Sequence, residues 1–422
     1  MAIRRLSLLA ALVFVSFACT PPPPGEAVGS SKQRITAAAP QADLDTAIAG
    51  NTDFALDLYR TMTSGKDGNL FISPHSISLA LSLAYAGSGG ATTTAFEHTM
   101  HVGLPQPQYH RAMNDLDRQL SSRGEGAKAS DGQPFRLAIA NQLFAQKGFP
   151  FEQPYLDLLA QEYGANVRLM DFVGKPDPSR VSINTWVEQM TEGKIVDLLA
   201  QGTISADTRA VLVNAIYFNA AWAKRFDAKN THPAPFHAID GTTPSVDMMF
   251  EAAMPGQLAT VNHVDVVSLP YDGKQLSMVI MMPPQQELAN FEQSLSAAKI
   301  ASLVAALQPA NIELTMPKFE LRTSESLSQA LVALGLGEAF GESGDFTTMS
   351  KAAQLGISDV VHQAFVKVSE SGTEAAAATA VVIGVTSVAQ PNPALVVDRP
   401  FVFAIRDDAT GAIVFLGRVT RP

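Results

Sequence analysis

A run of small residues interrupts the second half of the chain, VSESGTEAAAAT at 368–379. It follows a stretch of strand composition at 360–368 and continues with only alanine and threonine after Glu374, as far as Ala380. A β-branched segment comes next, and prolines at Pro391 and Pro393 end it. Proline is rare inside a sheet. We therefore predict a long segment between two strands that can itself become a strand if a partner is available.

Outside this run, the chain divides into a helical first part and a strand-rich second part. Apolar residues recur at helical spacing at 54–62, 77–84, 91–100 and 181–198. Strand composition occurs at 137–144, 211–218, 264–269, 276–282, 312–321 and 360–368, and in a C-terminal hairpin at 401–405 and 413–416. No polar linker divides the body, so we expect a single α+β domain.

Composition excludes several classes of function. The chain of 422 residues has 40 acidic and 30 basic side chains, a formal net charge of −10. It has no basic block, which argues against a nucleic-acid partner. The one cysteine, Cys19, excludes an intrachain disulfide and a cysteine-rich zinc site. No phosphate-binding loop and no nucleophile elbow occurs, so we expect no enzyme, no cofactor and no metal site.

The N-terminus is typical of an exported protein. Arg4 and Arg5 precede an apolar run at 6–17, which is shorter than the ~20 residues of a bilayer-spanning helix. We therefore expect residues 1–18 to be a signal peptide and the protein to be extracytoplasmic.

Cys19 stands at the end of this signal, after the small residue Ala18. The arrangement resembles a bacterial lipoprotein signal, in which the cysteine receives the lipid and anchors the chain to a membrane. Simple cleavage near Ala18, giving a secreted protein, is the alternative. Residues 19–44 are rich in Pro, Ser and Gly, and we expect them to form a flexible tether in front of a domain at 45–422.

Several motifs of this domain, in the same order, are similar to those of serpins, a family of serine protease inhibitors. They are NLFISPHSI at 69–77, INTWV at 183–187, TEGKI at 191–195, LVNAIYF at 212–218, MPKF at 316–319, VSESGTEAAAAT at 368–379, DRPFVF at 398–403 and FLGRV at 415–419. The resemblance implies one domain of three β-sheets and about nine helices, with an exposed reactive-centre loop.

The alanine-rich run resembles the hinge of that loop. The matching residues are Glu370, Gly372, Thr373, Glu374, Ala375, Ala376, Ala377, Ala378 and Thr379. If the loop enters a sheet, alternate residues from Thr373 to Val381 must face a packed core, and all of them are small or β-branched. A bulky or charged inward residue would block insertion, whereas Glu374 would face solvent.

Two further groups carry over from the resemblance. Ser73, Ser76, Asn214 and His362 match the shutter, which holds the central strands closed. Trp222, Lys318 and Glu370 match the breach, where insertion begins.

The function implied is suicide inhibition, in which a serine protease is trapped covalently by a chain that is itself no enzyme. In the family the cut falls about sixteen residues after the hinge glutamate, which places the reactive bond at Thr386-Ser387, with Ser387-Val388 and Val388-Ala389 as alternatives. Small or β-branched residues before the cut favour an elastase-like or subtilisin-like protease. We expect a monomer. The alternative function is a serpin fold that serves as a carrier or scaffold without inhibition.

Overall fold

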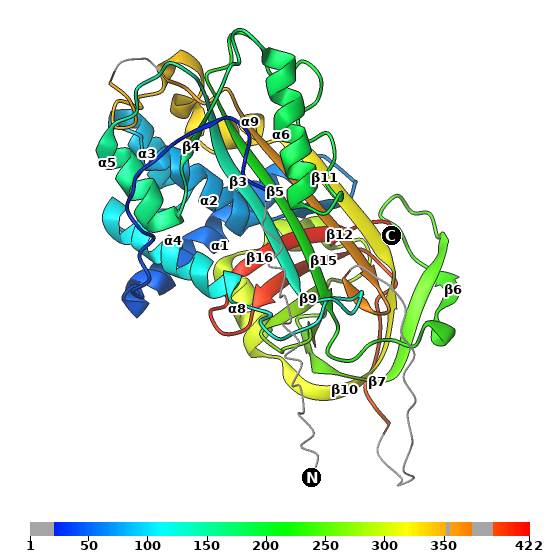
Figure 1. Ribbon diagram of the computed structural model, residues 1–422. Coiled ribbons are helices and arrows are strands. Elements are labelled where there is room, and N and C mark those ends of the chain that lie inside the picture. The colour runs from blue at the N-terminus through cyan, green and yellow to red at the C-terminus, as the bar shows by residue number, and fades with distance from the viewer. Residues whose placement is uncertain (1–20, 352–354, 374–390) are drawn as a thin grey trace, which may run out of the picture.

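The computed structural model describes residues 21–351, 355–373 and 391–422, and its elements form an α+β body (Figure 1). The described residues contain nine α-helices: α1 (Gln41–Thr63), α2 (Pro74–Tyr85), α3 (Gly90–Thr99), α4 (Gln106–Ser121), α5 (Gln153–Leu158), α6 (Pro176–Met190), α7 (Leu288–Gln293), α8 (Ala297–Ala305) and α9 (Ser328–Ala333). A π-helical turn, Leu159–Tyr163, continues α5. In this part of the chain, no helix has the length and apolar character that crossing a membrane requires.

A seven-stranded sheet occupies the centre of the molecule. Its strand order is β1 (Glu26–Val28), β4 (Val167–Met170), β3 (Arg136–Gln146), β5 (Ala210–Ala221), β13 (Gly372–Thr373), β12 (Asp359–Ser369) and β11 (Phe319–Ser326). The long strands β5 and β12 also pair directly, in parallel, below the two-residue strand β13.

The second sheet has nine strands. Its main path runs β14 (Ala394–Val396), β10 (Gln308–Pro317), β7 (Ser245–Val261), β8 (Val264–Pro270), β9 (Leu276–Met282), β15 (Phe401–Asp407), β16 (Ile413–Val419) and β2 (Leu70–Ile72), and β6 (His232–Pro235) pairs with β7. The described residues therefore form two sheets, where the resemblance implied three. Strand β7 accounts for the difference, because it pairs with β6 at one end and with β8 at the other. The expected fold class is confirmed.

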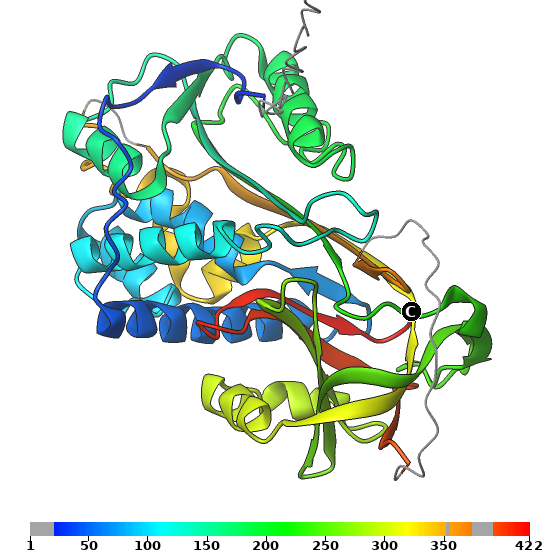
Figure 2. The same ribbon diagram turned by 60° about the horizontal axis from the view of Figure 1, so that its bottom comes forward.

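Strand β5 separates two layers of core. Val211, Val213 and Ala215 pack with α6 on one face, and the alternate residues Leu212 and Ile216 pack with the main core on the other. This alternation is the period of two that a strand imposes. Figure 2 shows α6 on one side of the sheet and the group of α1–α4 on the other. All twelve residues of β5 are therefore buried.

Two predicted elements, a helix and a strand, have different bounds in the structure. The helix predicted at 181–198 is α6, which begins at Pro176 and ends at Met190. Proline favours the first turn of a helix, and positive φ angles at Glu192 and Gly193 follow its end. The strand predicted at 312–321 is two strands, β10 and β11, which lie in different sheets and are separated by Lys318.

The N-terminal segment also differs from the expected tether. In the described part of 19–44, residues 26–28 form β1 at the edge of the seven-stranded sheet. The helix α1 begins at Gln41, before the expected start of the domain at residue 45. Backbone groups between them bond to the body, as in the hydrogen bond from the Ile35 amide to the Gln161 carbonyl. The composition is that of a linker, but edge pairing and helix contacts hold this stretch on the domain.

Candidate functional site

The hinge begins inside the seven-stranded sheet. Strand β12 ends at Ser369, the chain turns, and Gly372 and Thr373 return as β13 between β12 and β5. Thr373 lies opposite Val368 on one side and Ala220 on the other. Below this point β5 and β12 pair directly as far as Tyr217 and Phe365. Gly372 and Thr373, the last described residues of the predicted hinge, therefore lie at the top of the junction between β5 and β12. We call this junction the seam.

Thr373 is fully buried in this position. Its hydroxyl group lies 2.8 Å from the hydroxyl group of Tyr271, so the one polar atom of its side chain has a partner. Tyr271 stacks on Trp222, with ring centroids 4.7 Å apart and an interplanar angle of 6°. A small side chain with one hydrogen-bonding group fits this closed space, in line with the predicted inward position of Thr373.

Gly372 allows the chain to turn back into the sheet. Its φ angle of 143° lies in a region that residues with a side chain rarely adopt. A Cβ atom here would lie 2.2 Å from the carbonyl oxygen of Ala220 and 2.7 Å from the Cα atom of Ala221. The tight fit against β5 therefore requires glycine.

Trp222 fixes the turn that precedes the hinge. Its indole Nε1 donates to the Ser369 carbonyl at 2.9 Å, and its backbone amide donates to the Ser371 carbonyl at 3.1 Å. The structure thus places this predicted breach residue directly under the start of the hinge.

Glu370 has two side-chain partners in the turn. Its Oε1 lies 3.3 Å from the Lys318 Nζ and accepts a hydrogen bond of 2.7 Å from the Thr231 hydroxyl group. Burial acts to raise the pKa of the Glu370 carboxyl group, but hydrogen bonds from its own backbone amide, Thr231 and Lys318, with the Lys318 charge, hold the pKa below its usual value. The predicted breach pair is therefore present as an ion pair.

The four predicted shutter residues meet at the lower end of the seam. Ser73 caps α2, accepts from the Ser76 amide and donates to the Val414 carbonyl at 2.8 Å. The backbone amide of Ser73 also donates to His362 Nε2 at 3.3 Å. On the other ring nitrogen, His362 Nδ1 donates to Asn214 Oδ1. The shutter thus connects β12 to β5 and both to the start of α2.

Asn141 completes this network, and sequence analysis missed it. It lies opposite Asn214 in the β3–β5 pairing, and Asn214 lies opposite His362 in the β5–β12 pairing, so the three form a row across the sheet. Asn141 accepts from Ser76 at 3.1 Å and from Asn214 at 2.5 Å. Asparagine is uncommon within apolar strands, and its place in the predicted strand 137–144 was the signal that could have revealed it.

Burial keeps the shutter histidine neutral. His362 is fully buried, and the loss of hydration lowers its pKa to about 3. One ring nitrogen donates and the other accepts, so a second proton would face the N–H of Ser73. These hydrogen bonds join β5 and β12 to the start of α2.

The remaining predicted site residues lie outside the described residues. They are the hinge positions Glu374, Ala375, Ala376, Ala377, Ala378 and Thr379, the reactive-bond residues Thr386 and Ser387, and the lipid-attachment residue Cys19. After the gap, β14 pairs in parallel with β10 of the nine-stranded sheet. The described residues on the two sides of 374–390, Thr373 and the strand β14, therefore lie in different sheets. Within the described residues, no group of three or more acidic, histidine or cysteine side chains forms a metal site.

Comparison with known proteins gives one consistent result. The family model for "Serpin (serine protease inhibitor)" matches residues 49–422. A leukocyte elastase inhibitor from Sus scrofa is 38% identical over 386 residues, which cover 89% of this chain and 99% of that protein. The leukocyte elastase inhibitor from Bos taurus is 36% identical over 383 residues, with coverage of 89% and 99%.

A solved structure agrees with the sequence matches. Human thyroxine-binding globulin, in complex with thyroxine, superposes with a TM-score of 0.80 at 28% identity. The match covers 90% of this chain and 99% of that structure.

Proposed function

Because this chain belongs to the serpin family, we propose that it is a suicide inhibitor of serine proteases with shallow specificity pockets, of the elastase or subtilisin type. The observation that carries the proposal is the position of Gly372 and Thr373 between β5 and β12. These first residues of the predicted hinge already pair with both strands. The residues that follow them can therefore enter the sheet between the same two strands.

In the proposed mechanism, the serine of the protease attacks the carbonyl carbon of the residue before the cut. The acyl-enzyme forms and the new amino terminus leaves. Release of this end frees the hinge, and residues from Glu374 onward continue β13 down the seam. The protease, still esterified, is carried with the strand, and its catalytic geometry is distorted before water can cleave the ester.

Insertion is expected to be strongly favourable. A full strand adds about a dozen backbone hydrogen bonds at a net ~1 kcal/mol each, and burial of side chains adds about 25 cal/mol per Å². This sum is comparable with the ~5–15 kcal/mol that stabilises an ordinary domain. The uninserted form is therefore a kinetically trapped state, in which the shutter and breach contacts resist opening.

The expected protease class follows from the residues around the predicted cut. No arginine or lysine occurs between Lys367 and Arg399, so the loop offers no cation to a trypsin-like pocket. Thr386, or Ser387 or Val388 in the alternatives, suits a shallow pocket. Relatives named as elastase inhibitors support this choice.

We also propose that the protein is bacterial, exported and lipidated at Cys19. The support is the basic and apolar start of the chain and the placement of its one cysteine directly after it.

The test uses purified protein with elastase and with trypsin. We expect a complex that survives denaturing electrophoresis with elastase and none with trypsin. Mass spectrometry of the released C-terminal peptide should give a first residue between Ser387 and Gln390. Rapid trapping of trypsin, or a peptide that starts elsewhere, would overturn the assignment.

A carrier function without inhibition is the second candidate, since a solved structure similar to this chain has thyroxine bound. Thermal unfolding before and after loop cleavage separates the two. An inhibitor gains much stability when its cleaved loop inserts, whereas a carrier that does not insert its loop gains little.

A further inference from the structure

Residues 21–40 form a segment that we call the strap. It precedes the residues matched by the family model and runs along the outside of the body to the start of α1 (Figure 2). The strap binds the central sheet and α6 at one end and α4 at the other.

At its first end the strap is part of the sheet. Glu26, Ala27 and Val28 pair antiparallel with β4. Trp186 of α6 donates from its indole Nε1 to the Pro21 carbonyl at 3.2 Å. Gly25 packs so closely on β4 that a Cβ atom would lie 2.5 Å from the Leu169 carbonyl oxygen. These contacts join the strap to the half of the sheet that contains β4, β3 and β5.

At its second end the strap is bound to α4. Arg34 donates from Nε to the Asn114 side-chain oxygen at 2.8 Å and from Nη2 to the Asp117 carboxylate at 2.6 Å. Two backbone groups of the strap also bond to α4. The Thr36 carbonyl accepts from Arg118 at 2.7 Å, and the Ala39 amide donates to the Asp115 carboxylate at 3.1 Å. The bonds to Asp117 and Asp115 involve a charged acceptor, a type stronger than neutral hydrogen bonds.

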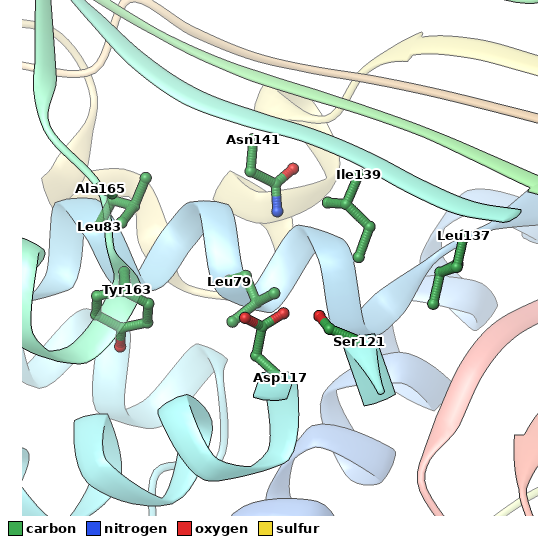
Figure 3. A pocket seen from close by; sticks show the side chains of 9 residues that line it. All are labelled: Leu79, Leu83, Asp117, Ser121, Leu137, Ile139, Asn141, Tyr163 and Ala165. Carbon is green, nitrogen blue, oxygen red and sulfur yellow. The ribbon is translucent and has the colours of Figure 1, made fainter. Parts of the chain in front are cut away.

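The layer between these two ends is incompletely packed. A pocket that is partly open to solvent lies between α2, α4 and β3 (Figure 3), and we call it the cavity. Its volume is about 270 Å³. Asp117 of α4 and Asn141 of β3 both line it. A gap removes the contacts that close packing would provide, so β3 is less firmly held to the helices here. Arg34 of the strap bonds to Asp117, one of the residues that line this cavity.

Insertion of a strand into the seam moves one half of the sheet. Neighbouring strands lie about 4.8 Å apart, so β5 must separate from β12 by about that distance. Strands β3, β4 and β1 pair in sequence on the far side of β5, and α6 packs on β3 through Trp186 and Phe144, whose ring centroids are 5.8 Å apart. A shift of this group relative to α4 would strain the strap, which is bonded to both.

We propose that the strap is a brake on opening of the central sheet, and that Arg34 is its principal contact with α4. Bound to α4, the strap holds β4 and β3 in the closed arrangement and slows insertion of the loop. Released, it leaves the sheet free to open across the cavity. This brake proposal rests on the proposed inhibitory function, because the movement that the strap slows is insertion of the loop.

The test measures sheet opening without a protease. A synthetic peptide with the sequence of residues 373–385 is mixed with the full-length protein, and its uptake into the sheet is followed by native electrophoresis. Arg34→Ala should take up the peptide about tenfold faster than the unaltered protein, the change expected for the loss of one or two charge-assisted hydrogen bonds from the closed state. Gln33→Ala, at the exposed position next to Arg34 in the same strap, is the matched control and should keep the original rate.

Two further variants separate a brake from a folding defect. Arg34→Lys can reach only one of the two acceptors and should give an intermediate rate. Removal of the strap up to Ala39 should give a rate at least as high as that of Arg34→Ala, with circular dichroism unchanged.

Each outcome has a defined meaning. If Arg34→Ala folds normally and takes up the peptide at the original rate, while the unaltered protein still traps elastase, the strap proposal alone is wrong. If the unaltered protein neither takes up the peptide nor forms an elastase complex, the strap proposal and the proposed function are both wrong.

Discussion

The hydroxyl groups of Thr373 and Tyr271 lie 2.8 Å apart, at the point where the hinge enters the central sheet. Thr373 comes from the strand that is to be extended, and Tyr271 follows β8, which belongs to the other sheet. The first residue of the predicted inward set is therefore in place before any cut. In the proposed mechanism, insertion therefore extends a pairing that already exists and does not have to start a new one.

The first prediction is that Thr373→Arg abolishes covalent trapping of elastase while the loop is still cut. A guanidinium group does not fit beside Tyr271, and an unpaired buried charge costs about 3 kcal/mol or more. Denaturing electrophoresis after incubation with elastase gives the result. Glu374→Arg is the control, because the predicted alternation places that side chain toward solvent. A complex with Thr373→Arg as abundant as that of the unaltered protein would refute the inward assignment.

The second prediction concerns Asn141, the shutter residue that the sequence analysis missed. Asn141→Ala removes the acceptor of Asn214 and Ser76 and leaves buried donors without a partner, so we expect a loss of about 1–3 kcal/mol from the closed state. Thermal unfolding should shift to lower temperature and peptide uptake should quicken. Asn290→Ala, at an exposed helix position, provides the comparison. Equal melting temperatures for the two variants would show that Asn141 does not stabilise the shutter.

The third prediction is a loss of stability in acid that depends on His362. Its pKa in the folded protein is about 3, whereas an unfolded histidine titrates near pH 6.5. Below that pH the unfolded chain binds a proton that the native sheet does not. Stability should therefore fall as the pH decreases from about 6.5 toward 3, by up to about 1.4 kcal/mol per pH unit.

Unfolding in urea at pH 7 and pH 5 measures this effect. His362→Gln should lose less stability between the two pH values than the unaltered protein. Part of the acid sensitivity should persist, because burial lowers the pKa of His110 to about 3 as well. His232→Gln, at an exposed site, should retain the full sensitivity. An unchanged pH dependence in His362→Gln would contradict the prediction.

The fourth prediction is that Cys19→Ser releases the protein from membranes. Stable anchoring requires more than one acyl chain, which lipidation of this cysteine would supply. Fractionation of cells that express the variant should move the protein to the soluble fraction, whereas Thr20→Ser should leave it on membranes. Unchanged partition of Cys19→Ser would exclude a lipid at this residue.

Much of the architecture could be predicted from local pattern. Helical spacing identified α1, α2 and α3, and the continuous apolar run at 211–218 correctly indicated a strand buried on both faces. Periodicity and composition depend on neighbours along the chain, and in these elements the local preference and the final packing agree.

Features that depend on distant residues could not be predicted in this way. Nothing local distinguishes Thr231, which donates to Glu370 from 139 positions away. The pairing of β1 with β4 joins residues 26–28 to residues 167–169, and the composition of the first of these segments resembles a linker. In both cases the partner across space, rather than the residue's own neighbourhood, determines the structure.

The direction of the strands at the seam has a consequence for the energy of the closed form. Strands β5 and β12 run parallel, whereas β13 is antiparallel to both. Each residue that follows β13 into the seam would replace one parallel contact with two antiparallel ones, and antiparallel ladders are slightly more stable per residue. The closed sheet is thus joined along its centre by the weaker kind of ladder. The geometry of the new hydrogen bonds, in addition to their number, therefore favours insertion of the loop as a strand.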